Sequence, residues 1–273
     1  MSTWFITGCS TGFGRALAQA TLARGWNTVV TARDPAAIAD LADGYPNALP
    51  LALDVADHGQ VVAAVAAANA RFGGIDVLVN NAGYGYRSAV EEGERAAIEA
   101  MFAVNFYGAI DLIQQVLPQM RERRSGTIIN MSSVAGRMTA PGSGFYAASK
   151  CALEGMSDGL RVETAEYGIR VLVVEPGPFR TDFAGRSLVQ SEAPLDAYAK
   201  TAGARRKEND SMDGTQPGDP VKGAQAIIAA ATAENPPFRL PLGVSAVTRI
   251  RELLAQQAAE LEAWAEVGLA TDF

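Results

Sequence analysis

Residues 3–14 read TWFITGCSTGFG, an apolar stretch that runs directly into a glycine-rich turn. Thr3–Ile6 predicts a short strand, and residues 14–24 carry apolar side chains at helical spacing. Glycines permit a tight turn and the close approach of a pyrophosphate, which the N–H groups and the field of a helix N-terminus favour. The spacing G-x-x-x-G-x-G differs from the common G-x-G-x-x-G. Glycine turns are common, but a turn between the first strand and the first helix favours a dinucleotide loop.

Outward from this turn, apolar runs of strand length alternate with helical stretches. Repeated strand–helix–strand units connect by right-handed crossovers into a parallel sheet with helices on both faces. We therefore expect an α/β, doubly wound Rossmann fold of about seven strands, forming a single domain over residues 1–273. The expected strands are residues 3–6, 28–32, 48–54, 75–79, 127–131, 169–175 and 238–242. The expected helices are residues 14–24, a helix from Asp34-Pro35, 61–72, 93–122 with a kink at Pro118, 144–167, a helix from Asp219-Pro220, and a C-terminal helix 244–266.

The segment 183–218 interrupts this alternation. It is polar, rich in Gly, Ser, Asp and Lys/Arg, and it shows no strand character. A segment of this length without regular structure inside a compact domain is usually functional or mobile.

The composition excludes several classes of protein. A net charge of -7 and a pI of about 4.9 disfavour binding to nucleic acid, because an acidic protein repels phosphate backbones. Cys9, Cys151 and His58 are too few for a disulfide framework or a Cys/His metal cluster, so we expect no metal. The N-terminus lacks the features of a signal peptide, and no apolar run is long enough to span a membrane. We expect a cytoplasmic protein without membrane contact.

The end of the second expected strand bears on cofactor choice. An acidic residue about 20 positions beyond the glycines binds the ribose 2′-hydroxyl of NAD, and Asp34 has this spacing. Asp34 also precedes Pro35 and is well placed to cap a helix. The guanidinium of Arg33 suits a 2′-phosphate. We favour NADP, although Arg33 also fits a solvated charge at the end of a strand.

Tyr146 and Lys150 lie four residues apart in an expected helix, which places them on one helix face. A free tyrosine has a pKa near 10, and a neighbouring ammonium group lowers it by stabilising the phenolate. Such a phenol can protonate a developing alkoxide or deprotonate an alcohol. The spacing Tyr-x-x-x-Lys alone is common on exposed helices.

Residues at three other strand ends give this pair a context. Ser133 follows the strand 127–131, Asn80-Asn81-Ala82-Gly83 ends the strand 75–79, and Pro176-Gly177-Pro178 ends the strand 169–175. The carboxyl ends of parallel strands share one sheet edge, where ligands bind. The sequence therefore predicts a single crevice.

These motifs together resemble the short-chain dehydrogenase/reductase family. The resemblance covers residues 3–185 closely and the rest loosely. Within the family, the stretches TGCSTGFG (residues 7–14) and TARD (residues 31–34) of this sequence are similar to the 17β-hydroxysteroid and retinol dehydrogenase branch. That branch often uses NADP(H). The motifs that carry the resemblance are Thr7-Gly8-x3-Gly12-x-Gly14, Asn80-Asn81-Ala82-Gly83, Ser133, Tyr146-x3-Lys150 and Pro176-Gly177.

The resemblance implies a role for each matching residue. Tyr146 would be the acid/base, Lys150 would lower its pKa and hold the nicotinamide ribose, and Ser133 would orient the substrate oxygen. Asn105 matches an asparagine that positions a water in a proton relay. The residues that would bind the cofactor are Gly8, Ser10, Thr11, Gly12, Phe13, Gly14, Arg33, Asp54, Val55, Asn81, Ala82, Gly83, Tyr146, Lys150, Pro176, Gly177 and Thr181.

The resemblance also implies features outside this site. The segment 183–218 would form a substrate lid, in which Phe183, Leu188 and Tyr198 are either apolar lid contacts or packing residues. A homodimer or homotetramer would form through the long helices near 93–122 and 144–167.

These observations lead us to expect an NADP(H)-dependent oxidoreductase, with NAD(H) as the other cofactor, that interconverts a small-molecule carbonyl and an alcohol. The alternative is a non-catalytic dinucleotide-binding redox regulator, which need not keep Tyr146, Lys150 and Ser133 together. An epimerase or dehydratase shares much of the chemistry, but the segment 183–218 is too short for the sugar-nucleotide domain of such enzymes.

Overall fold

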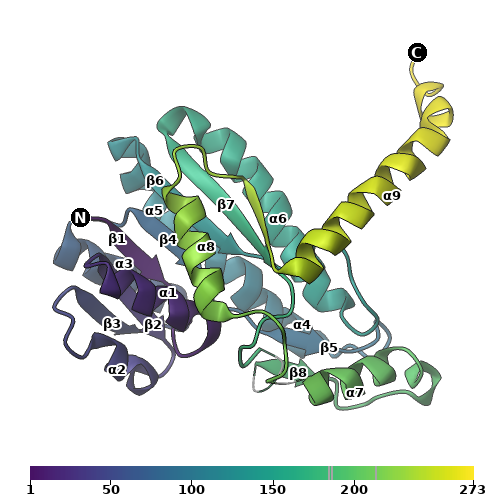
Figure 1. The fold of residues 1–273 in the computed structure, drawn as a ribbon, viewed down its shortest axis with the longest axis horizontal. Helices are drawn as coiled ribbons and strands as arrows, with labels where there is room; N and C mark the ends of the chain where they lie inside the picture. The colour runs from purple at the N-terminus through teal and green to yellow at the C-terminus, as the bar shows by residue number, and fades with distance from the viewer. Residues whose placement is uncertain (184, 186, 213) are drawn as a thin grey trace.

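The computed structural model describes residues 1–183, 185, 187–212 and 214–273. Its centre is a sheet of seven parallel strands in the order β3-β2-β1-β4-β6-β7-β9 (Figure 1). The order reverses between β1 and β4, and such a switch point opens a crevice at the carboxyl ends of the strands. The expected doubly wound sheet is confirmed. The strands are β1 (Thr3–Ile6), β2 (Asn27–Ala32), β3 (Ala48–Ala52), β4 (Val77–Asn80), β6 (Gly126–Met131), β7 (Ile169–Pro176) and β9 (Arg239–Leu242).

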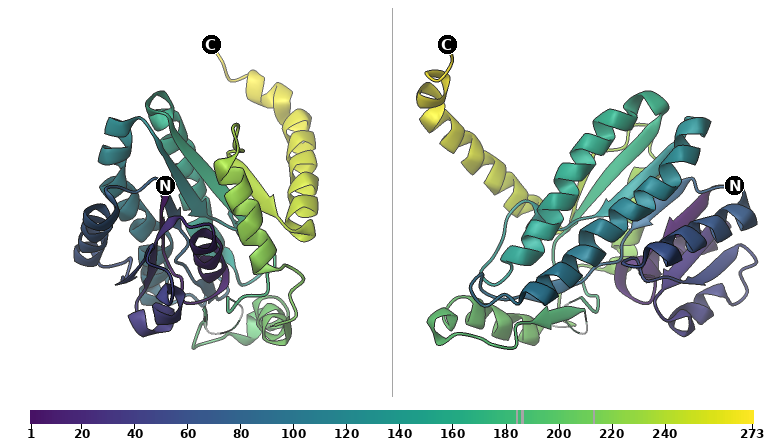
Figure 2. Two further views of the ribbon diagram at one scale, coloured as in Figure 1. Left: turned by 60° about the vertical axis from the view of Figure 1, so that its left-hand side comes forward. Right: turned by 180° about the vertical axis from the view of Figure 1, so that it is seen from behind.

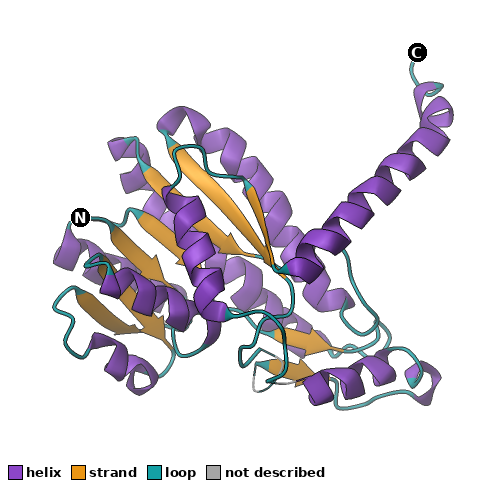
Figure 3. Ribbon diagram, in the orientation of Figure 1, coloured by secondary structure: helices purple, strands orange, loops and turns teal. Residues whose placement is uncertain are grey.

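Helices cover both faces of this sheet (Figure 3). Successive strand residues point to opposite faces, so Ile6 is buried in one core layer and Phe5 in the other. The apolar runs of the strands therefore fill two cores at once. One layer contains α1 (Gly12–Ala23) and α8 (Pro220–Thr232), and the other contains α3 (His58–Phe72), α5 (Gly108–Arg123) and α6 (Gly144–Thr164).

Aspartate caps determine where several helices begin. The carboxylates of Asp57 and Asp219 accept N–H bonds from the first turns of α3 and α8. Asp34 does the same ahead of Pro35, as the sequence predicted. The element it caps is a short 3₁₀ turn, η1 (Pro35–Ile38), which leads into the single turn α2 (Ala39–Ala42).

The expected helix 93–122 is one long helix with an irregular turn. It consists of α4 (Arg95–Phe102), a π-helical turn η2 (Ala103–Tyr107) and α5. The chain stays helical through Pro118, where a kink was expected, and the irregular turn lies at Asn105 instead. Among the described residues this helix, 95–123, is long and apolar enough to cross a membrane, and a core helix packed on a sheet has the same composition.

The segment 183–218 contains regular structure, and the expectation that it has no strand is wrong. Its strand β8 (Leu188–Gln190) pairs in parallel with β5 (Gly85–Arg87) in a small second sheet. A strand of three residues is too short to show a period, and this pairing joins residues a hundred positions apart. Positions 184, 186 and 213 lie outside the described residues. The segment also holds η5 (Asp196–Tyr198) and α7 (Ala202–Met212), and it lies beyond the arrowheads of the main strands (Figure 1).

The C-terminal helix α9 (Val244–Leu269) is confirmed and runs three residues longer than expected. It projects away from the rest of the molecule (Figure 2). Its buried residues are Ala246 and Ile250, near its start, whereas Leu261 and Trp264 are exposed. The remaining short helical turns are η3 (Val134–Gly136) and η4 (Ala165–Tyr167).

Candidate active site

The turn between β1 and α1 has the backbone geometry that its glycines predict. Gly8 has a φ of 69° and Gly12 a φ of 57°, in the left-handed region that favours glycine. A Cβ placed on Gly14 would lie 2.3 Å from the carbonyl oxygen of Gly8, so a side chain at this position would push the turn away from the helix. These positions fit a turn that brings backbone close to a pyrophosphate.

The chain after β4 braces this turn. The Asn81 side-chain amide donates to the carbonyl oxygens of Thr7, at 2.7 Å, and Gly8, at 3.1 Å. The Thr7 hydroxyl accepts the backbone N–H groups of Asn81 and Ala82, both at 2.9 Å. These bonds hold the ends of β1 and β4 together at the switch point of the sheet.

A cavity of about 710 Å³ lies along these strand ends. Residues that the sequence did not single out, such as Leu53, Tyr84 and Val104, complete its wall. Of the residues expected to bind cofactor, those that line this cavity are Gly8, Ser10, Thr11, Gly12, Phe13, Arg33, Asp54, Val55, Asn81, Ala82, Gly83 and Thr181. A dinucleotide fits this wall and turn. Gly14 lies inside α1 and acts through its lack of a side chain.

The two candidate residues for cofactor choice have different surroundings. The Asp34 carboxylate accepts the N–H of Ala36 at 2.9 Å, so it serves as the cap of η1. Arg33 is exposed and lines the larger cavity. Asp34 thus caps η1 with one carboxylate oxygen, and the Arg33 guanidinium lies at the cavity.

A second cavity, of about 430 Å³, adjoins the first and is lined by three of the four expected catalytic residues, whereas Asn105 lines neither cavity. Tyr146, Ser133, Lys150, Pro176 and Gly177 all contribute to its wall. The two cavities share Phe13, Asn81, Gly83, Thr181 and Phe183. The predicted crevice is therefore present.

Tyr146 is buried in α6, and its phenol lies near the Ser133 side chain in the same cavity. Burial raises the pKa of this phenol, while the Ser133 hydroxyl and the charge of Arg87 lower it. The geometry separates Ser133 from its neighbour, because the Ser132 hydroxyl donates instead to Glu154 at 2.7 Å. Ser133 is thus the serine that meets the tyrosine.

Lys150 lies one helical turn from Tyr146, with its Nζ 5.9 Å from the centre of the phenol ring. The ammonium group donates to the carbonyl oxygen of Met131, at the end of β6, at 2.8 Å. Burial lowers the pKa of Lys150 to about 8, and the nearby Glu154 opposes this shift. The lysine is therefore held at the strand end, and its pKa lies about one unit above neutral pH.

Asn105 lies in the π-helical turn, and its side chain hydrogen-bonds to Tyr84 and Ser149. Its amide donates to the Tyr84 carbonyl oxygen at 2.9 Å and to the Ser149 hydroxyl at 3.2 Å. Its oxygen accepts the Tyr84 N–H at 3.0 Å. A Cβ on Gly83 would lie 3.0 Å from the Asn105 oxygen and 3.5 Å from the Lys150 nitrogen, so a glycine separates the two side chains.

Arg87 and Phe183 also contact Tyr146. The Arg87 guanidinium carbon lies 5.8 Å from the phenol ring centre, and the Phe183 ring centre lies 5.4 Å from it. Phe183 was a candidate lid contact, whereas Arg87 was missed. The signal that could have found Arg87 is its place seven residues after Asn80, but nothing in a sequence shows that β5 turns it inward.

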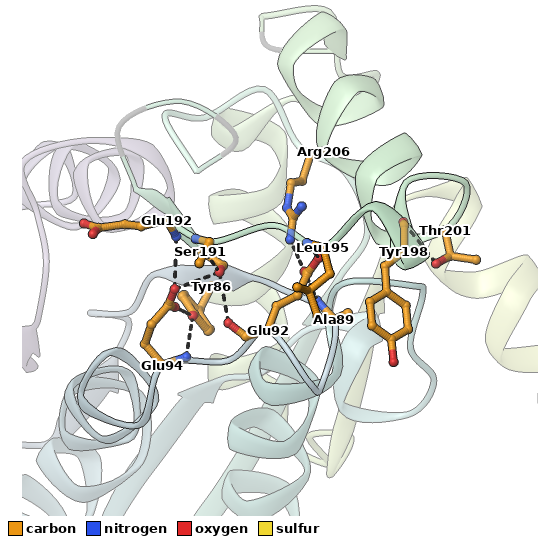
Figure 4. Close-up of polar contacts among 11 residues, drawn as sticks. Tyr86, Ala89, Glu92, Glu94, Ser191, Glu192, Leu195, Tyr198, Thr201 and Arg206 are labelled. Atoms are coloured by element: carbon orange, nitrogen blue, oxygen red, sulfur yellow. Dashed lines mark hydrogen bonds and ion pairs between the residues drawn. The ribbon is translucent and has the colours of Figure 1, made fainter.

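Polar contacts anchor the segment 183–218 to the loop before α4 (Figure 4). Glu92 accepts the Leu195 N–H at 2.9 Å and pairs with Arg206, and Glu94 accepts the Ser191 hydroxyl at 2.7 Å. Of the candidate lid residues, Leu188 lines the smaller cavity. Tyr198 lies outside both cavities and donates to Glu91 at 2.6 Å.

Comparison with known proteins agrees with this geometry. The family model described as short chain dehydrogenase matches residues 2–191. An oxidoreductase from Botryotinia fuckeliana, BOA17, is 37% identical over 270 residues, which cover 98% of each chain.

Solved structures give the same result. A short-chain dehydrogenase from Streptomyces avermitilis is 42% identical, with a TM-score of 0.92 and full coverage of both chains. A 3-ketoacyl-(acyl-carrier-protein) reductase from Brucella melitensis, complexed with NADH, is 26% identical with a TM-score of 0.74, covering 88% of this chain and 96% of the other. The chain belongs to the short-chain dehydrogenase/reductase family, and it is an NAD(P)-dependent oxidoreductase of the Rossmann fold.

Proposed function

We propose that this protein interconverts a small-molecule carbonyl and an alcohol with NADP(H), and that Tyr146 is its acid/base. The observation that carries the proposal is that Tyr146, Ser133 and Lys150 line one cavity, which adjoins the dinucleotide turn, with the Lys150 nitrogen 5.9 Å from the phenol ring centre. A nicotinamide, when bound, supplies or accepts the hydride.

The roles of the three side chains follow from their chemistry. In reduction, the Tyr146 hydroxyl gives its proton to the oxygen of the carbonyl as negative charge develops there. Lys150, when protonated, stabilises the phenolate that remains. Ser133 donates a hydrogen bond that orients the same oxygen, since a carbonyl oxygen can only accept, and the Ala135 N–H bond at 3.1 Å leaves the Ser133 proton free for it.

We assign Asn105 the role of positioning a water that returns a proton toward Lys150. Its adjacency to the lysine across Gly83 supports this role. The amide contacts to Tyr84 and Ser149 hold it in the π-helical turn.

The cofactor is proposed to be NADP(H), bound by the glycine turn, by Asp54-Val55, by Asn81-Ala82-Gly83 and by Pro176, Gly177 and Thr181. Arg33 and Ser10 would contact the 2′-phosphate, which a guanidinium matches in charge and geometry. NAD(H) is the alternative, and the reductase from Brucella melitensis holds NADH.

Three further assignments accompany this function. The segment 183–218 would act as a substrate lid above the smaller cavity. The protein would form a homo-oligomer through α5 and α6, and it would work in the cytoplasm.

Replacing Tyr146 by Phe tests the proposal. The variant is expected to retain cofactor binding, measured by calorimetry, and to lose turnover of a panel of ketones, aldehydes and alcohols, measured by cofactor absorbance. Undiminished turnover in Y146F would contradict the role of Tyr146. Absence of turnover in the wild type with every carbonyl and both cofactors would favour the alternative, a dinucleotide-binding regulator.

A further inference from the structure

Arg87 is a buried cation, and two of its three guanidinium nitrogens make no hydrogen bond in the described part of the chain. It lies in β5 and lines the smaller cavity, with 8% of its surface exposed. Its Nε and Nη1 atoms are buried and make no hydrogen bond. A guanidinium has five donors and remains charged in proteins, so burial without an acceptor is unfavourable. Such a group is expected to have a ligand.

The surroundings of Arg87 add to this requirement. Arg205 lies near enough for its charge to act on Arg87, and it lines the same cavity. The Nη1 atom of Arg205 pairs with Glu208 at 2.6 Å, while its Nε is buried and unbonded. Glu208 lines the same cavity and balances the charge of Arg205, so Arg87 is the cation of this pair whose charge would be balanced by an anion in the cavity.

The place of Arg87 relative to Tyr146 defines where the anion would lie. The guanidinium carbon is 5.8 Å from the centre of the phenol ring. A molecule whose carbonyl oxygen meets the Tyr146 hydroxyl would therefore carry its anionic group a few bonds from the reacting carbon. The planar fork of a guanidinium matches a carboxylate in a bidentate pair.

We propose that Arg87 binds the carboxylate of the substrate, and that the substrates of this site are 2-oxo or 3-oxo carboxylic acids and the corresponding hydroxy acids. The proposal rests on the function proposed above. In reduction, the carbonyl carbon gains a hydride from NADPH, the oxygen gains the proton of Tyr146, and the products are the hydroxy acid and NADP⁺. The carboxylate keeps its charge throughout.

The test compares matched substrates that differ only in this charge. The substrates are 2-oxobutanoate and 3-oxobutanoate, each measured against its own methyl ester. The wild type is expected to show a higher kcat/KM for at least one acid than for its ester. Arg87→Gln is expected to lose this preference through a decrease of roughly 10- to 100-fold in kcat/KM for the acid, the range for hydrogen bonds to a charged group. Arg87→Lys is expected to retain part of it.

A matched control is Arg249→Gln. Arg249 lines the same cavity but is exposed to water, so its charge is screened and the preference for the acid is expected to change little. Circular dichroism and the melting temperature show whether each variant folds. Because the buried Nε and Nη1 atoms of Arg87 make no hydrogen bond that the change would break, Arg87→Gln is expected to fold.

The outcomes separate this proposal from the function on which it rests. An equal loss for acid and ester in Arg87→Gln would mean that Arg87 acts through the pKa of Tyr146, and this result would overturn carboxylate binding. A wild type that reduces the esters and neutral ketones better than the acids would overturn it as well, while leaving the reductase intact. If no carbonyl is turned over, calorimetric titration of the NADP⁺ complex with both 2- and 3-hydroxybutanoate decides. Binding that Arg87→Gln weakens supports the site, and no such binding in the wild type overturns it.

Discussion

At the scale of single residues, Lys150 has the property that links this site to pH. Burial lowers the pKa of its ammonium group to about 8, and its bond to the Met131 carbonyl oxygen keeps it in place. Burial raises the pKa of the Tyr146 phenol, so the phenolate depends on nearby positive charge. The chemistry proposed for the site thus requires a protonated Lys150.

We therefore predict that carbonyl reduction falls as the pH rises through about 8, where Lys150 loses its proton. Lys150→Arg keeps a charge at higher pH, because an arginine does not deprotonate in this range. Its alkaline decline should move upward by at least one pH unit, although the longer side chain lowers the maximal rate. The measurement is kcat against pH for both proteins, and an identical alkaline limb in the two would contradict the prediction.

Arg33 carries a second prediction at this scale. It is exposed at the edge of the larger cavity, and Asp34 beside it is occupied as a helix cap. Arg33→Ala should lower kcat/KM with NADPH by roughly tenfold or more, the low end for hydrogen bonds to a charged group. The value with NADH should change by less than about twofold, since NADH has no 2′-phosphate. A wild type that prefers NADH would refute the assignment of NADP.

At the scale of elements, the glycine turn and α6 contain glycines with opposite requirements. A Cβ on Gly14 would lie 2.3 Å from the Gly8 carbonyl oxygen, whereas a Cβ on Gly155, inside α6, would meet nothing within 4 Å. Gly14→Ala should therefore cost roughly 1–3 kcal/mol of stability through overpacking and abolish cofactor binding. Gly155→Ala should gain about 0.5–1 kcal/mol, as alanine does in a helix interior. Urea denaturation with calorimetric titration of cofactor checks both, and equal effects at the two sites would count against this view of the turn.

The elements also show how far the sequence predicts the structure. The main strands were predictable because each is a continuous apolar run between turn residues, and the helix starts after Asp34 and Asp219 were predictable from these residues as caps. The pairing of β5 with β8 was not, because it depends on a contact between distant segments of three residues each.

In the site too, contacts between distant segments could not be predicted from the sequence. Tyr146, Lys150 and Ser133 follow from spacing, because the helix period and the strand ends determine where they point. Arg87 does not, since its burial is a property of the small second sheet. The π-helical turn at Asn105 was likewise hidden, because a local change of helix type leaves the apolar period almost unchanged.

At the scale of the whole molecule, α6 and the π-helical turn before α5 leave apolar side chains on the surface. Val162, on α6, is 69% exposed, and Tyr107, at the end of η2, is 62% exposed. In the most apolar part of the helix 95–123, 33% of the residues are buried. Apolar helix faces of this kind fit the oligomer proposed above.

We predict that Val162→Glu weakens this oligomer, because it places a charge on the exposed apolar part of α6 that the proposed contact would cover. Light scattering after gel filtration should show a smaller species than the wild type at the same concentration. Leu261→Glu, on the projecting part of α9, is the control. It should leave the size of the oligomer that forms through α5 and α6 unchanged. A wild type that is monomeric, or a Val162→Glu variant of wild-type size, would count against this interface.

The two ends of the helix α9 differ in burial, since the first turns pack on the domain and the outer turns are exposed. Its first turns carry Ser245 and Arg249 at the smaller cavity and bury Ala246 and Ile250. Beyond Leu254 its side chains are mostly exposed, and an isolated helix is marginal in water. In a single copy of the chain, the amide hydrogens of this outer part should exchange quickly with deuterium from the solvent. The outer turns of α9 are therefore a place to attach a fluorophore or a surface tether, far from the residues that meet the substrate.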